Sequence, residues 1–76
     1  MIKTFKELAE AKFGSVYACA KYFDEHELGI SGVYIYKLAA GEYSNVSIKM
    51  LPILAIELEI DILDLLEIFG INTEVV

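Results

Sequence analysis

The sequence contains no arginine, and all six of its positively charged residues are lysine. It has one cysteine, Cys19, so no disulfide can form within the chain. A lone cysteine is typical of a reducing compartment, where it serves as a small core residue. The longest apolar run, 50–56, is far too short to span a membrane, and no signal peptide is visible. We therefore expect a soluble, cytoplasmic protein with no membrane partner.

The residues needed for common catalytic and metal sites are also scarce. One histidine, His26, and one cysteine cannot form a zinc site without several carboxylates, and no ligand-like spacing occurs. There is no glycine-rich phosphate loop and no nucleophile–base pair. The acids Glu57, Glu59 and Asp61 alternate, so they would not converge on one helix. We expect no metal, no cofactor and no enzymatic activity.

Length and charge set the remaining limits. A chain of 76 residues forms a single domain, 1–76, and buries only about 60% of its unfolded surface. Its 57% hydrophobic content argues against intrinsic disorder and suggests that a second chain covers some apolar surface. Residues 1–37 hold five lysines and five acids, whereas 38–76 hold one lysine and seven acids. The net charge of −6 therefore lies in the second half, and it argues against non-specific nucleic-acid binding.

Capping residues predict two helices in the first third of the chain. The first begins after Thr4, which forms a capping box with Glu7, and ends at Gly14. The second begins after Ser15 as N-cap and continues with apolar residues at helical spacing. The sequence then predicts an acidic loop over 24–29.

Two further helices follow this loop. The third runs from Ser31 to Gly41; its β-branched and aromatic residues favour a strand, but its alanines and the C-terminal glycine favour a helix. The fourth begins at Ser47 as N-cap and includes Pro52, which predicts either a kink or a regular helix that begins near the proline.

The fifth helix begins at Asp61 as N-cap, with Asp64 in its first turn, and ends after Phe69 at Gly70. The last residues, 71–76, are apolar and β-prone, which predicts a short extended tail.

The segment from Gly29 to Leu66 resembles the Cro/C1-type (phage-repressor-like) helix-turn-helix family. The residues that carry the resemblance are Gly29-Ile30-Ser31, Ile35, Leu38, Gly41, Ser47-Ile48, Leu51, Leu54-Ala55, Leu58, Ile60 and Leu65-Leu66, together with the small Ala20 in the second helix. The chain departs from the family in its turn between the second and third helices, which is about five residues longer, and in its loop after Gly41, which is one residue longer. The basic residues typical of the recognition helix are largely missing.

The resemblance implies an all-α, five-helix domain that regulates transcription by binding double-stranded DNA as a dimer, with a recognition helix at about 31–40 in the major groove. The base-contact residues would be Ser31, Gly32, Tyr34 and Tyr36; the backbone-contact residues would be Ser15, Tyr17, Lys37, Tyr43, Asn45, Ser47 and Lys49. No arginine is available for the bidentate contact with guanine. We expect weak, strongly salt-sensitive binding.

Apolar residues in the last two helices suggest an interface. Ile53, Ile56 and Leu63 lie where the family has polar residues, and together with Ile68 and Phe69 they predict a homodimer or partner surface. Alternatively, the C-terminal tail folds back and covers them. The neighbouring acids, from Glu57 to Glu67, form either a solvated rim or a surface that attracts a basic protein.

A second function remains open from the sequence. The missing arginine, the acidic balance and the excess apolar surface also fit a helix-turn-helix scaffold that binds proteins and has little DNA affinity. Such a modulator would act as an antirepressor, an inhibitor or an acidic DNA mimic. The five tyrosines, all between positions 17 and 43, fit this reading as well, because tyrosine is enriched at protein interfaces.

Overall fold

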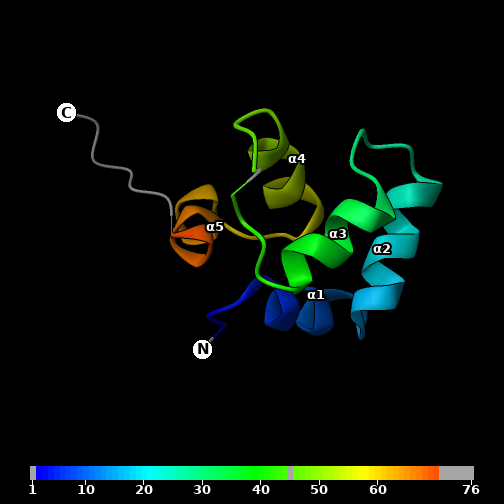
Figure 1. Cartoon of the computed structure of the whole chain (residues 1–76), viewed down its shortest axis with the longest axis horizontal. Coiled ribbons are helices and arrows are strands. Elements are labelled where there is room, and N and C mark those ends of the chain that lie inside the picture. Colours follow the sequence, from blue (N-terminus) through cyan, green and yellow to red (C-terminus); the bar gives the residue numbers. More distant parts are fainter. Residues whose placement is uncertain (1, 45, 71–76) are drawn as a thin grey trace.

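The computed structural model describes residues 2–44 and 46–70, and within them it contains five α-helices and no strand (Figure 1). The helices are α1 (Phe5–Phe13), α2 (Val16–Glu25), α3 (Gly32–Ala39), α4 (Met50–Glu57) and α5 (Ile62–Phe69). The expected all-α, five-helix fold is therefore confirmed. The predicted extended tail, 71–76, lies outside the described residues.

The predicted caps of α1 and α2 are confirmed. The Thr4 hydroxyl accepts a hydrogen bond from the Glu7 N–H at 3.1 Å, and the Glu7 carboxylate accepts one from the Thr4 N–H. Ser15 accepts a hydrogen bond from the Ala18 N–H at 3.0 Å. The acidic loop begins two residues later than predicted, because α2 continues to Glu25 before the connection to α3.

The segment 32–39 is a helix despite its strand-like composition. Ser31 caps it by accepting a hydrogen bond from the Tyr34 N–H at 3.1 Å. Ile35 and Leu38 are completely buried, so their packing on one side of α3 outweighs the local preference for a strand. Gly41 has φ 89°, a conformation that glycine adopts without strain after a helix end.

The predicted start of α4 at Ser47 is wrong. The helix begins at Met50, and Ser47 contributes its carbonyl oxygen, which accepts a hydrogen bond from the Met50 N–H at 3.0 Å. Pro52 therefore lies in the first turn. The N–H groups of the first turn have no acceptor within the helix, so the absence of an N–H in proline costs no helical hydrogen bond there. The alternative of a regular helix that begins near the proline is the correct one.

The predicted limits of α5 are confirmed. Asp61 caps the helix by accepting a hydrogen bond from the Leu63 N–H at 2.8 Å, and Gly70 ends it in the left-handed conformation.

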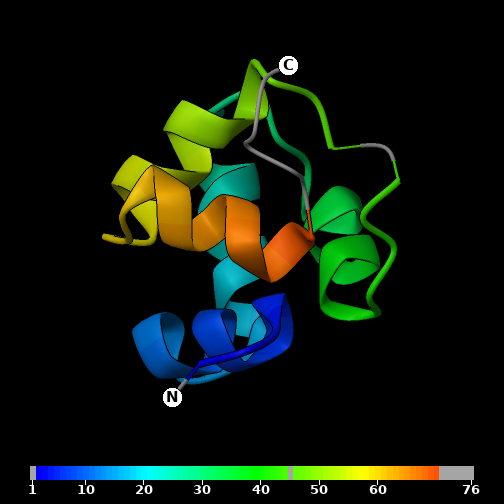
Figure 2. The ribbon, with the colours of Figure 1, turned by 90° about the vertical axis from the view of Figure 1, so that its left-hand side faces the viewer.

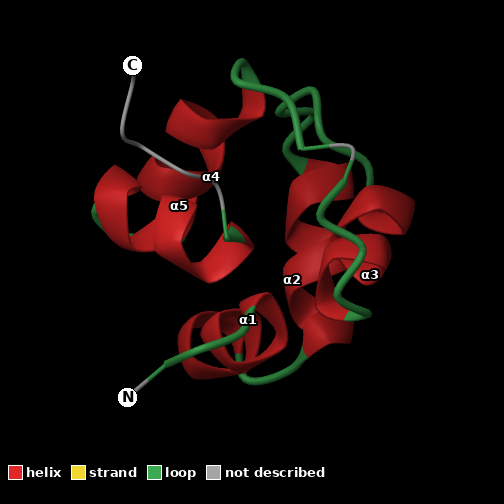
Figure 3. Ribbon diagram, turned by 60° about the vertical axis from the view of Figure 1, so that its left-hand side comes forward, coloured by secondary structure: helices red, strands yellow, loops and turns green. Residues whose placement is uncertain are grey.

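The core lies where three groups of helices meet. In Figure 3, α2 and α3 lie together on one side, α4 and α5 lie on the other, and α1 lies beneath them. Its largest fully buried side chains include Phe5, Phe23, Leu54 and Leu65. Cys19 is buried among them, as the sequence predicts, and burial raises the pKa of its thiol to about 12.

An aromatic cluster joins the first and last helices. The Phe69 ring lies 6.0 Å from the Phe5 ring and 5.0 Å from the Tyr43 ring, measured between centroids. The Tyr43 hydroxyl also accepts a hydrogen bond from the Phe5 N–H at 3.2 Å. Phe69, which the sequence suggests as an interface residue, is 6% exposed and is part of the core.

Replacing Phe69 by Ala should lower the free energy of unfolding by about 3–5 kcal/mol, because a large ring is removed from a closed core. Ile48→Ala is the control at a residue outside the helices and outside the core; with its side chain 81% exposed, it should change stability by less than ~0.5 kcal/mol. Urea unfolding followed by circular dichroism measures both. Equal effects of the two substitutions would contradict this placement of the core.

Candidate nucleic-acid interface

The outer face of α3 is the part of the predicted DNA surface that the structure exposes most clearly. Tyr36 is 46% exposed and Lys37 is exposed beside it, together with Val33, a residue not among the expected contacts, which is 67% exposed. The helix itself, GVYIYKLA, carries one lysine and no carboxylate. This face is therefore apolar and aromatic, with one positive charge.

The four residues expected to contact bases have different surroundings. Ser31 is exposed and caps α3, and Tyr36 is exposed. Tyr34 is half-buried, and burial raises the pKa of its hydroxyl. Gly32 is buried, and its N–H donates a hydrogen bond to the Asp24 carboxylate at 2.7 Å. The expectation that Gly32 faces a DNA groove is therefore wrong.

The expected backbone contacts are similarly divided. Tyr17, Lys37, Ser47 and Lys49 are exposed, and Ser15 is half-buried as the cap of α2. Asn45 lies outside the described residues. Tyr43 is half-buried, and its hydroxyl is bonded to the Phe5 N–H while its ring packs on Phe69. Tyr43 thus packs within the chain, and its expected contact with the DNA backbone stays a prediction.

Asp24 is, besides Val33, a residue at this surface that the sequence does not reveal. It lies in the last turn of α2, and its carboxylate reaches the first residue of α3. A helix N-terminus attracts negative charge, because its first N–H groups lack partners within the helix. Nothing in the local spacing signals this contact, because it depends on how α2 and α3 cross.

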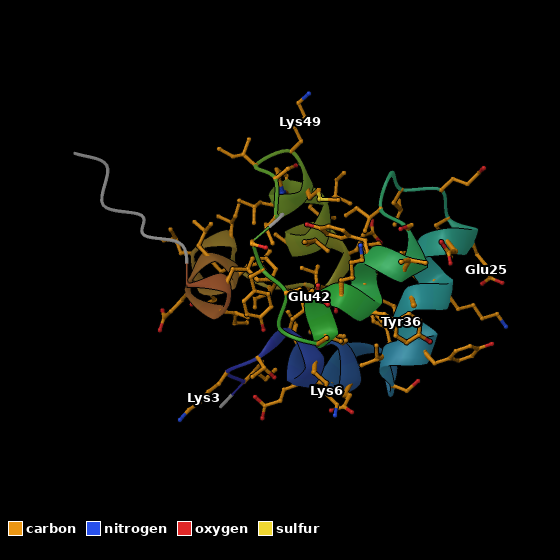
Figure 4. The ribbon with its side chains drawn as sticks, viewed as in Figure 1. Lys3, Lys6, Glu25, Tyr36, Glu42 and Lys49 are labelled. Carbon is orange, nitrogen blue, oxygen red and sulfur yellow. The ribbon has the colours of Figure 1, made fainter. Side chains whose placement is uncertain are left out.

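The charges around this face are mixed. Between Ser15 and Lys49, the described charged residues are Lys21, Lys37 and Lys49 against Asp24, Glu25, Glu27 and Glu42, and all seven are exposed. In Figure 4, Lys49 extends from the opposite end of the molecule to Lys3 and Lys6, and Glu25 projects from the end of α2. The face is therefore close to neutral but not basic.

Two carboxylates of the acidic second half contact the first two helices. Glu57 accepts a 2.6 Å hydrogen bond from the Tyr22 hydroxyl, which raises the pKa of that tyrosine. Glu59 forms an ion pair with Lys12 at 3.5 Å. These contacts direct the Glu57 carboxylate toward α2 and the Glu59 carboxylate toward α1.

A groove of about 780 Å³ lies between α1 and the segment 59–68. Figure 2 shows α1 below α5 at this place. Apolar side chains of Leu8, Ile60 and Ile68 line it. Its charged residues are divided, with Lys3 and Lys12 on the side of α1 and Glu59, Asp64 and Glu67 on the other side. It is a second surface that a partner with apolar and charged groups could contact.

The predicted interface residues do not share one environment. Ile56 is 72% exposed and Leu63 is 61% exposed. Ile53 and Ile68 are half-buried and pack against the core, and Phe69 belongs to the core. Only the first two therefore present most of their side chain to a partner.

The comparisons with known proteins give no assignment, because the chain matches no family model, no curated protein and no solved structure. None of the five described helices is of the length and hydrophobicity that crossing a lipid bilayer requires. Over residues 2–44 and 46–70, no three histidine, cysteine or acidic side chains converge in a metal-binding group.

Gly32→Ala should destabilise the protein by about 1–2 kcal/mol, because overpacking a tight contact has a cost of this size. The added Cβ would overlap the Asp24 carboxylate and lie 3.1 Å from the Ala20 carbonyl oxygen. In an Asp24→Ala background the same substitution should cost less, because the carboxylate is gone. Urea unfolding of the four proteins measures this coupling, and identical costs in the two backgrounds would rule out the Asp24 contact as the cause.

Proposed function

We propose that the protein is a small DNA-binding transcriptional regulator that binds double-stranded DNA as a dimer through α3. The observation that carries this proposal is the outer face of α3, where Val33, Tyr36 and Lys37 are exposed on a helix without a carboxylate. A helix of this kind can enter the major groove, which is wide enough to admit it. The resemblance of 29–66 to Cro/C1-type proteins supports the same use of α3.

The exposed side chains determine the kind of contact. Tyr36 can donate a hydrogen bond to a phosphate or a base edge, and Val33 can pack against a thymine methyl group. Lys37 and Lys49 can contact phosphates. Four such lysine contacts in a dimer give a dependence of log K on log salt of roughly −4. The binding is therefore modest in strength and sensitive to salt.

A labelled duplex from the region upstream of the gene should bind saturably at about 50 mM salt, where backbone contacts are strong. The double variant Lys37→Ala/Lys49→Ala should weaken binding at least ~10-fold and make it less salt-sensitive. Lys3→Ala/Lys6→Ala removes the same amount of charge at two lysines on the other side of the molecule from Lys49 (Figure 4) and is the matched control. Fluorescence anisotropy measures both, and absence of saturable binding, or equal losses in the two variants, would count against the proposal.

The dimer in this proposal uses Ile56 and Leu63. Both are large aliphatic residues with most of their side chain in solvent, at the end of α4 and the start of α5. Burying them against a second copy removes apolar surface from water. A two-fold dimer would then present two α3 helices to a palindromic site.

Sedimentation equilibrium should find a dimer that Ile56→Asp/Leu63→Asp converts to a monomer, because aspartate is costly to bury in an apolar contact. Ile48→Asp is the control, since Ile48 is even more exposed, at 81%, but lies before α4. It should leave the dimer intact. A wild-type protein that is already monomeric would contradict the proposed dimer.

A second candidate function is that of a protein-binding modulator with little DNA affinity. The groove between α1 and the segment 59–68 favours it, because apolar side chains there lie beside Glu59, Asp64 and Glu67. A basic partner protein would contact these acids. The chain would then act on that partner as an antirepressor, an inhibitor or a DNA mimic. Stoichiometric co-purification of a basic protein that is lost in Asp64→Lys/Glu67→Lys would favour this function over DNA binding.

A further inference from the structure

The contact between Asp24 and Gly32 joins the end of α2 to the beginning of α3. The Gly32 N–H donates a hydrogen bond to Asp24 Oδ1 at 2.7 Å. Gly32 itself is buried, whereas Asp24 is exposed, so the carboxylate lies at the surface directly beside the first turn of α3. Ser31 occupies the neighbouring cap position and accepts the Tyr34 N–H.

This contact has an electrostatic consequence for any polyanion. The first N–H groups of a helix and its positive dipole end normally favour a phosphate. Here a carboxylate from the same chain already accepts one of these N–H groups, and it adds a full negative charge at the N-terminus of α3. Phosphates that approach this end of the helix therefore meet repulsion where a helix N-terminus would otherwise attract them.

The geometry points to a specific role: we propose that Asp24 sets the strength of DNA binding by holding the N-terminus of α3 with a group that repels phosphate. This inference rests on the proposed DNA-binding function and deepens it. Asp24 does not contact DNA as a reader. It is a positioning residue that fixes α3 against α2 and at the same time keeps the affinity of the domain low.

The capping role and the repulsive role can be separated. Asparagine has nearly the same shape as aspartate, and its carbonyl oxygen caps a helix about as well. Asp24→Asn therefore keeps the acceptor for the Gly32 N–H and removes only the charge. If capping were the whole role of Asp24, this substitution would leave DNA affinity unchanged apart from the general effect of one charge.

Glu25→Gln provides the matched control for that general effect. Glu25 is the next residue of α2, is exposed and carries the same charge, and no described group forms a hydrogen bond or ion pair with its side chain. Asp24→Glu is a second control, because it keeps the negative charge at the same position. Asp24→Ser is neutral, and its side chain is too short to replace the contact with the Gly32 N–H; it removes the same charge and covers the case in which Asp24→Asn fails to fold.

The experiment is a fluorescence-anisotropy titration of each full-length variant with the same labelled duplex that the wild-type protein binds. At about 50 mM salt, Asp24→Asn and Asp24→Ser should each bind about 10-fold more tightly than the wild type. Glu25→Gln should gain less than ~2-fold and Asp24→Glu should stay weak. The advantage of the neutral variants should shrink at about 200 mM salt, because screening reduces the repulsion they relieve.

The results separate the two proposals. If the wild type binds DNA but Asp24→Asn gains no more than Glu25→Gln, the role of Asp24 is overturned and the DNA-binding function stands. If neither the wild type nor any variant binds, the DNA-binding function itself fails and this inference fails with it. An advantage that persists unchanged at the higher salt would also overturn the inference, because it would indicate a change of shape rather than of charge.

Discussion

The close crossing of α3 over α2 is the contact on which the rest of the molecule depends. Gly32 has no side chain, and a Cβ there would lie 3.1 Å from the carbonyl oxygen of Ala20. Ala20 is also a small residue, and it is buried. Two small residues therefore allow the backbones to approach closely. This approach turns Ile35 and Leu38 into the core and leaves the opposite side of α3 in solvent. The candidate interface is thus a consequence of what the crossing buries.

The remaining helices depend on side chains that join distant segments. The Tyr43 hydroxyl meets the backbone of Phe5, 38 residues earlier, and both rings pack with Phe69 at the end of α5. On the other side, Tyr22 of α2 donates its hydrogen bond to Glu57 of α4. A small domain buries only a small core, so these few contacts contribute strongly to the packing of α4 and α5 against the first three helices.

The helix ends could be predicted from the sequence where they depend on near neighbours. The caps at Thr4, Ser15, Ser31 and Asp61 each bond an N–H two or three residues along, so a short stretch contains the whole interaction. The prediction of Ser47 as the N-cap of α4 was wrong, because Pro52 fits the helix without the loss of a hydrogen bond only if α4 begins later. The surroundings of Gly32, Tyr43 and Phe69 could not be predicted, because each is decided by a residue on another helix. The candidate contact residues come from the resemblance to Cro/C1-type proteins, and the structure shows only which of them are exposed and which are buried or bonded within the chain.

In the proposed DNA complex, the distribution of charge would make α3 bind mainly through uncharged contacts. Glu57 of α4 and Glu59 of the following turn are bonded to Tyr22 and Lys12, so these two carboxylates are engaged with α2 and α1. Asp24 before α3 and Glu42 after it nevertheless leave a carboxylate near each end of the helix. The attraction between the helix and a phosphate backbone is therefore weakest at those ends. In the middle of the helix, Val33 and Tyr36 are the exposed side chains that could contact DNA. Contacts of these types depend on groove shape and base edges rather than on charge. Discrimination between sequences can then be retained although the attraction to DNA in general is low, since the non-specific part of the affinity comes almost entirely from positive charge.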